Sequence, residues 1–315
     1  MTRKIALEEH FLVEGFAYRG RTEGSGPAAA FRRQAAERLP DIDVLRLGAM
    51  DKAGIDIAVL SLFQPGIQGE RDAVTAIRKA KTVNDTLAER IARHSRRFRG
   101  FAAVPMQDPR EAADELERAV KQLGFKGALI NGHTQGVYLD DARCLPFWER
   151  VAALDVPIYL HPANPMTIPA AFEGYPGLAQ AIFGWAAETG GHALRLVLSG
   201  LFYRFPSLTV ILGHMGEALP FTSGASTVAS RSPSRRWHSG TCRPSTSAGT
   251  SPSPSLAPSR PSRSAARSTR WASAAYCSRS TTRSRTATRQ PSSSRPHPCA
   301  RPSARRYAFA MRSDC

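Results

Sequence analysis

Two potential metal ligands stand two positions apart near the start of the chain. Glu8 and His10 form a Glu-x-His pair that closes the run Lys4–His10, whose composition favours a β-strand. On a strand, side chains two positions apart point to the same side. A carboxylate oxygen and an imidazole nitrogen at this spacing can bind one divalent ion. Taken alone, the pair is more simply interpreted as a solvated strand end.

Two further histidines end apolar runs. His161 ends Val156–His161, and His214 ends Leu208–His214 with Glu217 three residues later. A carboxylate beside a histidine can fix the tautomer of the ring and raise its pKa, which suits general acid/base catalysis. A lone histidine in either place is also compatible with a core residue bonded to backbone. Because three separate strands end in such groups, we expect a metal-dependent site where they meet.

Asn131 ends a further apolar run at the same end of the predicted sheet. We expect its amide either to contact the substrate or to form a turn before Gly132.

Strands and helices alternate along the first 221 residues. The predicted strands are Lys4–His10, Ile57–Phe63, Phe101–Met106, Gly127–Asn131, Val156–His161 and Leu208–His214. The predicted helices are Asp43–Ala53, Asp72–His94, Pro109–Leu123, Leu145–Leu154 and Gly177–Leu201. No Gly-rich dinucleotide turn follows the first strand, and histidines collect at strand ends, so a (β/α)8 barrel is favoured over an open doubly wound sheet. Six strands do not close such a barrel.

The composition of the chain changes abruptly after Phe221. The chain of 315 residues carries a formal charge of +17, of which residues 222–315 hold +16, with 17 Arg, no Lys and one acid. This stretch also has 24 Ser, no Ile, one Leu and one Val, so it has almost nothing with which to bury a core. We expect a disordered basic tail that follows an incomplete barrel domain at residues 1–221. Only one of the five cysteines precedes residue 222, which fits a reducing cytoplasm, and the chain shows no signal peptide or membrane-spanning run.

Five segments of the first 221 residues resemble one enzyme family. They are KIALEEHF at 4–11, MDKAGID at 50–56, GALING at 127–132, YLHP at 159–162 and LGHMGEALPF at 212–221. Together they resemble the amidohydrolase-related (ACMSD-like) aromatic decarboxylases, in the branch of the γ-resorcylate and 2,3-dihydroxybenzoate decarboxylases. Glu-x-His in place of His-x-His on the first strand points to the decarboxylases rather than to the hydrolases.

The resemblance implies roles for the residues that match the motifs. Glu8, His10 and His161 would bind a divalent metal, zinc or manganese, and His214 with Glu217 would be the catalytic acid/base pair. The implied reaction is the non-oxidative decarboxylation of a hydroxybenzoate. The family also uses an Arg shortly after Leu-Pro-Phe to hold the substrate carboxylate, and a final-strand Asp that binds the metal and protonates the ring. Neither residue is present in this sequence.

A shift of the reading frame explains the break inside the last motif. If one base is lost near codon 222, the shifted codons of residues 222–231 permit Leu-Trp-Arg-Ile-Asp-Ser-Arg-Val-Ala, with the missing Arg. Those of residues 276–288 permit Leu-Phe-Ser-Val-Asp-Tyr-Pro-Phe-Glu-Asp-Gly-Asp, with the missing Asp. We therefore predict that residues 222–315 are out-of-frame translation. The loss of two strands would leave the edges of the first and sixth strands open, and the chain as written would be inactive or nearly so.

Two alternative functions remain at this point. Members of the wider superfamily also hydrolyse substrates with a metal-bound hydroxide, so a metal-dependent hydrolase is possible. The acid-free tail could instead bind nucleic acid by releasing counterions, although it has no Lys and few aromatic residues. Our interpretation is a cytoplasmic enzyme whose partner is a small aromatic acid. We expect no membrane association and no physiological nucleic-acid partner. The family resemblance implies a homo-oligomer, but we do not expect the truncated chain to form it.

Overall fold

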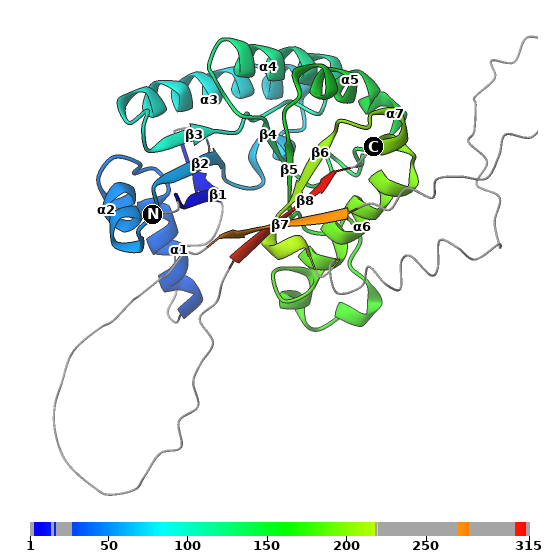
Figure 1. Cartoon of the computed structure of the whole chain (residues 1–315). Coiled ribbons are helices and arrows are strands. Elements are labelled where there is room, and N and C mark those ends of the chain that lie inside the picture. The colour runs from blue at the N-terminus through cyan, green and yellow to red at the C-terminus, as the bar shows by residue number, and fades with distance from the viewer. Residues whose placement is uncertain are drawn as a thin grey trace, which may run out of the picture.

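A computed structural model of the chain describes residues 3–13, 16, 27–217 and 219, and the backbone of residues 270–276 and 306–312. Six parallel strands form the inner layer, and helices cover them on the outside (Figure 1). The strands are β1 Ile5–Phe11, β2 Ile57–Leu62, β3 Phe98–Gly100, β4 Ala128–Asn131, β5 Ile158–His161 and β6 Thr209–Leu212. The predicted alternation of strands and helices is confirmed.

The parallel strands follow one another in chain order. β1 pairs with β2 and β2 with β3, while β4 pairs with β5 and β5 with β6. A bridge between Ala102 and Ala128 joins the two groups. The third strand was predicted at Phe101–Met106, but it ends at Gly100, because the chain after Ala102 turns away to the helix that begins at Pro109.

Seven α-helices among the described residues flank the strands. They are α1 Pro27–Arg38, α2 Leu45–Ala53, α3 Ala73–Arg93, α4 Pro109–Lys121, α5 Leu145–Leu154, α6 Gly184–Leu198 and α7 Leu201–Arg204. Short 3-10 helices occur at η1 Gly66–Gly69, η2 Ala142–Cys144, η3 Ala170–Phe172, η4 Pro176–Ala179 and η5 His214–Gly216. Helix α1 was not predicted, and the single helix expected at Gly177–Leu201 is divided into η4, α6 and α7.

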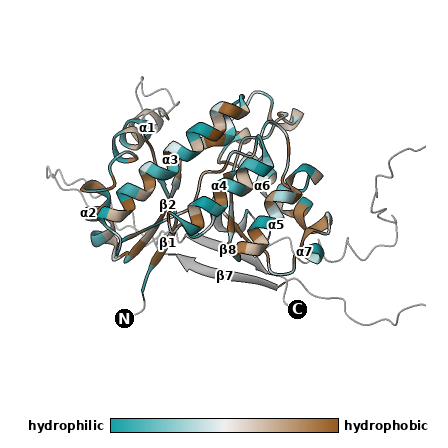
Figure 2. Cartoon of the chain, turned by 90° about the horizontal axis from the view of Figure 1, so that it is seen from above, coloured by the Kyte–Doolittle hydropathy of each residue, from teal (hydrophilic) through white to brown (hydrophobic). Residues whose placement is uncertain are grey.

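Capping residues fix where the outer helices α3 and α4 begin. The Asp72 carboxylate accepts a hydrogen bond from the Thr75 N–H at 2.7 Å, before α3. Asp108 caps α4 in the same way, with Pro109 in the first turn. Both helices carry hydrophobic residues toward the strands and hydrophilic residues on other faces (Figure 2).

An apolar layer fills the space inside the six strands. Each strand, or the residue just after it, supplies one member: Leu7, Val59, Phe101, Leu129, Tyr159 and Ile211. Because strand side chains alternate, the next inward positions lie one layer nearer the carboxyl ends of the strands. Those positions include Ser61, Asn131 and His161. The interior is therefore apolar in its lower layer and polar near the carboxyl ends of the strands, as in a (β/α)8 barrel.

Two strands of the basic tail lie beside the parallel strands. Residues Arg306–Arg312 form β8, which pairs antiparallel with β6, and Arg270–Tyr276 form β7, which pairs antiparallel with β8. β7 also lies next to β1 (Figure 1). The expectation of open edges and of a tail without regular structure differs from the structure at these segments. They are the stretches where the tail's aromatic and Ala residues concentrate, and β8 pairs the polar backbone groups along the edge of β6.

The rest of the tail lies outside the described residues, so the prediction of disorder there stays a prediction. None of the helices among the described residues is long and apolar enough to cross a membrane.

Candidate metal centre

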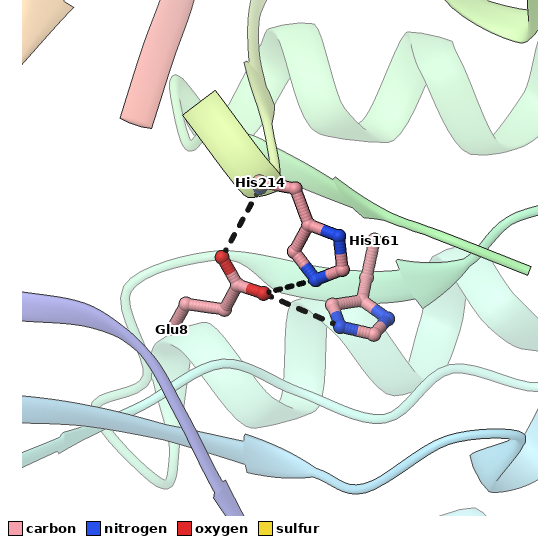
Figure 3. Close-up of side chains that lie close together, drawn as sticks. All are labelled: Glu8, His161 and His214. Atoms are coloured by element: carbon pink, nitrogen blue, oxygen red, sulfur yellow. Dashed lines mark hydrogen bonds and ion pairs between the residues drawn. The ribbon is translucent and has the colours of Figure 1, made fainter. Parts of the chain in front are cut away.

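Three predicted site residues meet at the carboxyl ends of the strands. Oε1 of Glu8 lies 2.9 Å from Nε2 of His214 and 3.4 Å from Nε2 of His161 (Figure 3). Their ligand atoms all lie within 4.8 Å of one another. Glu8 comes from β1, His161 from the end of β5 and His214 from η5 after β6, so residues more than 150 positions apart converge on one carboxylate oxygen.

A bulge in β1 allows this approach. The pairing with β2 shifts between Ala6 and Glu9, which places one extra residue on β1. Leu7 can therefore join the apolar layer while Glu8, next to it, reaches the polar site.

His10 adjoins the same cluster on the side of His161. Its Nε2 lies 3.1 Å from Nε2 of His161, and its Nδ1 lies 3.1 Å from Oγ of the buried Ser61 on β2. The structure thus brings together all three residues predicted as metal ligands. It adds His214, which was predicted as a catalytic residue, to the group around the Glu8 carboxylate.

The donor atoms of Glu8, His161 and His214 are spaced to fit one divalent ion, and His10 lies beside them next to His161. Two ligands bonded to an ion at about 2.1 Å lie roughly 3.0–3.4 Å apart in octahedral or tetrahedral geometry. The distances from Glu8 to His161 and His214, and from His10 to His161, are 3.4, 2.9 and 3.1 Å. Nδ1 of His161 lies 3.1 Å from the carbonyl oxygen of Pro162, which orients the ring so that Nε2 faces the Glu8 side of the cluster.

The protonation states of the donors also fit a metal. Burial lowers the pKa of His10 to about 3, with a further contribution from the charge of His161. Burial likewise lowers the pKa of His161, against the opposing effect of Glu8. Burial raises the pKa of Glu8, but hydrogen bonds to His161 and His214 outweigh it and hold that pKa well below its usual range. Neutral imidazoles and an ionised carboxylate are the forms that bind metals.

His214 and Glu217 lie on a strained turn. Both residues have left-handed backbones, with φ of 44° and 51°, which is uncommon for residues other than glycine and occurs often at functional sites. Nδ1 of His214 lies 3.5 Å from Oε1 of Glu217, whose pKa burial raises to about 7. The indole of Trp185 on α6 lies against the His214 ring, with centroids 5.6 Å apart, and donates to Oδ1 of Asn164 at 2.6 Å.

Asn131 occupies the predicted place at the end of β4. It pairs in register with His161 on β5, so the two side chains lie on the same face of the sheet. Its Oδ1 is buried and has no hydrogen-bond partner among the described residues. A buried acceptor without a partner is costly, and a substrate hydroxyl could satisfy it.

Three residues near the centre were not predicted from the sequence: Ser61, Tyr159 and Trp185. Ser61 and Tyr159 lie two positions from Val59 and His161 on inward faces of β2 and β5, and strand periodicity could have identified them. Trp185 follows an irregular segment whose path the sequence does not specify.

The sequence matches a family of metal-dependent enzymes over most of its length. The family model described as amidohydrolase matches residues 10–260. A γ-resorcylate decarboxylase from Polaromonas sp. strain JS666 is 47% identical over 229 residues, which cover 70% of this chain and 69% of that protein. One from Rhodococcus jostii strain RHA1 is 45% identical over 230 residues, with the same coverage.

Solved structures give the same grouping. The 2,6-dihydroxybenzoate decarboxylase from Rhizobium has a TM-score of 0.68 and 40% identity, over 75% of this chain and 76% of that chain. A dihydroxybenzoic acid decarboxylase from Polaromonas sp. JS666, with bound manganese and the inhibitor 2-nitroresorcinol, has a TM-score of 0.65 and 46% identity, over 70% and 68%. Neither the hydrolase nor the nucleic-acid alternative is favoured by these similarities. The chain belongs to the amidohydrolase family, in its branch of aromatic decarboxylases.

Proposed function

We propose that this chain derives from a metal-dependent decarboxylase of hydroxybenzoates. The observation that carries the proposal is the convergence of His161 and His214 on Oε1 of Glu8, at 3.4 and 2.9 Å. The relatives include enzymes of γ-resorcylate and 2,6-dihydroxybenzoate, which supports a dihydroxybenzoate as the substrate class.

Glu8, His10 and His161 would hold the divalent metal, and His214 lies within reach of the same Glu8 oxygen. Manganese is the natural first choice because the similar Polaromonas structure contains it, and zinc is the second candidate. When bound, the metal supplies Lewis acidity that holds the phenolate and carboxylate oxygens of the substrate.

His214 and Glu217 are suited to hold and move a proton. In the overall reaction the bond from the ring carbon to the carboxylate breaks, CO2 leaves, and a proton takes its place on that carbon. Glu217, with a pKa of about 7, can exchange a proton with Nδ1 of His214 near neutral pH. The Nε2 atom of the same ring faces the Glu8 side of the cluster.

Asn131 would orient the substrate. Its unpartnered Oδ1 accepts a hydrogen bond from a ring hydroxyl, beside the His161 side of the site. The Arg and the final-strand Asp that the family resemblance implies are not present, and within the described part of the chain the metal group consists of Glu8, His161 and His214, with no further carboxylate ligand.

The remaining features of the proposal concern location and partners. We propose a cytoplasmic enzyme that acts on a small aromatic acid, without a nucleic-acid partner for the basic tail. The formal net charge of residues 1–221 is +1, so this part of the chain offers no general attraction for polyanions.

Supplying hydroxybenzoates with Mn²⁺ and measuring released CO2 tests the proposal. The assay compares the chain as written with a chain whose frame is restored by one base near codon 222, and includes lactone and amide substrates. We expect decarboxylation only by the restored chain, and its loss in His161→Ala. Hydrolysis without CO2 release would overturn the proposal in favour of a hydrolase.

A further inference from the structure

The apolar layer of the barrel contains one polar group, the hydroxyl of Tyr159. The other members of the layer are Leu7, Val59, Phe101, Leu129 and Ile211, none of which can form a side-chain hydrogen bond. Tyr159 is fully buried, and its ring lies 5.9 Å from that of Phe101 between centroids. A buried hydroxyl costs free energy unless it has a partner.

That partner is the second oxygen of the Glu8 carboxylate. The Tyr159 hydroxyl donates to Oε2 of Glu8 at 2.7 Å. The backbone N–H of His214 also approaches Oε2, at 3.3 Å. Oε1, in contrast, faces the histidine nitrogens. The two oxygens of Glu8 therefore have separate tasks, because one is held by the protein and the other faces the cluster.

The neighbouring backbone leaves room for this arrangement. A Cβ atom on Gly213 would lie 3.3 Å from Cε1 of Tyr159 and 3.2 Å from Cδ of Pro162. A larger residue at Gly213 would crowd the Tyr159 ring from the side of β6. The turn that carries His214 starts at this glycine, so the ring and the turn pack directly against each other.

We propose that Tyr159 is a positioning residue that fixes the Glu8 carboxylate, so that Oε1 is presented to a divalent metal. This inference rests on the proposed metal function. The hydroxyl does not contact the reacting atoms; it restricts rotation of the carboxylate and, through Oε2, connects Glu8 to the strained turn of His214. Partners of this kind change metal affinity by roughly 10–100-fold when they are removed.

The test measures Mn²⁺ affinity of the full chain by electron paramagnetic resonance of the free ion. Tyr159→Phe removes one oxygen and keeps the ring, and Tyr138→Phe is the matched control. Tyr138 donates to Glu188 at 2.6 Å, in a similar tyrosine–carboxylate pair outside the metal centre. We expect Tyr159→Phe to weaken binding about tenfold or more, and Tyr138→Phe to leave it within about twofold of the unsubstituted chain.

Circular dichroism and thermal unfolding without metal check that each variant folds. If Tyr159→Phe does not fold, Tyr159→Met tests the same loss with a side chain that repacks easily. Unchanged affinity in the folded Tyr159 variant, or an equal loss in both tyrosine variants, overturns the inference alone. No Mn²⁺ binding by the unsubstituted chain would contradict the proposed metal function, and the inference with it.

Discussion

Nε2 of His10 and Nε2 of His161 lie 3.1 Å apart, although 151 positions separate the two residues in the chain. Their rings meet edge to face, with centroids 4.6 Å apart. Each ring is oriented by a bond from its other nitrogen, to Ser61 for His10 and to Pro162 for His161. β1 and β5 thus present two oriented imidazoles to each other. A partner that lies between the two Nε2 atoms, such as a metal ion, would contact both rings at once.

The first prediction concerns metal affinity. We expect the chain to bind Mn²⁺ or Zn²⁺ weakly and substoichiometrically, because it has Glu8, His10 and His161 but not the final-strand Asp that the resemblance implies. His161→Ala should lower that affinity at least about tenfold, since it removes a ligand. Isothermal titration calorimetry measures both values.

His94→Ala is the control for this prediction. Nε2 of His94 lies 2.8 Å from Oδ1 of Asp43 at a partly exposed position outside the centre. Tight binding at one equivalent that survives His161→Ala would show that the metal site lies elsewhere.

The second prediction concerns the pH dependence of stability. Burial raises the pKa of Glu217 from 4.5 to about 7, so the folded state of the metal-free chain binds this proton more tightly than the unfolded state. The resulting stabilisation is complete below pH 4.5 and is lost as the pH rises through about 7. The loss amounts to roughly 3 kcal/mol of unfolding free energy.

Urea unfolding of the chain and of Glu217→Gln at several pH values isolates this effect. As the pH rises from 4.5 to 8, the unsubstituted chain should lose unfolding free energy relative to Glu217→Gln, because the amide cannot ionise. Glu149→Gln, at an exposed ion pair with Arg204, should show no such trend. A pH-independent difference for Glu217→Gln would contradict the prediction.

The sequence predicted the parts of the site that depend on strand periodicity. Glu8 and His10 share a face because they are two positions apart, and His161 follows a run of apolar residues that must be buried. It could not predict that a bulge in β1 lets Leu7 and Glu8 both face inward, because one extra residue in a pairing depends on the neighbouring strand.

The less regular parts of the fold were harder to predict. The segment before α6, which carries Trp185 to the His214 ring, has no repeating hydrophobic pattern. Pairing of β8 with β6 was also missed, since composition indicates whether a segment can build its own core and not whether it can lie along an existing strand edge.

The third prediction concerns the tail. Composition predicts that trypsin cuts first in residues 231–267 and 279–305, where arginines are frequent and residues that could build a core are scarce. Residues 27–217, which contain the buried core, should resist longer. Mass spectrometry of timed digests gives the order of cleavage.

Hydrogen exchange adds a test of the strand pairing. Amides of residues 306–312 should exchange more slowly than those of the surrounding tail, because β8 is bonded to both β6 and β7. Protection across the whole of residues 222–315 would instead indicate a folded C-terminal domain and would contradict the frameshift interpretation.

The last prediction concerns activity and follows from the residues that the frame change removes. The strand pairing of β8 covers the edge of β6, but β8 runs antiparallel to both β6 and β7, and neither β7 nor β8 contains an Asp. They therefore supply neither the metal ligand nor the proton donor that the family resemblance implies. The loss of an electrostatic contact such as the carboxylate-binding Arg costs about 10²–10³ in rate by itself.

We expect no measurable hydroxybenzoate decarboxylation by the chain as written. Restoring one base near codon 222 should give an active enzyme that depends on Glu8, His10, His161 and His214. Product analysis by liquid chromatography decides the question: turnover by the unrestored chain, or a restored enzyme indifferent to His161→Ala, would show that the assignment of these residues is wrong.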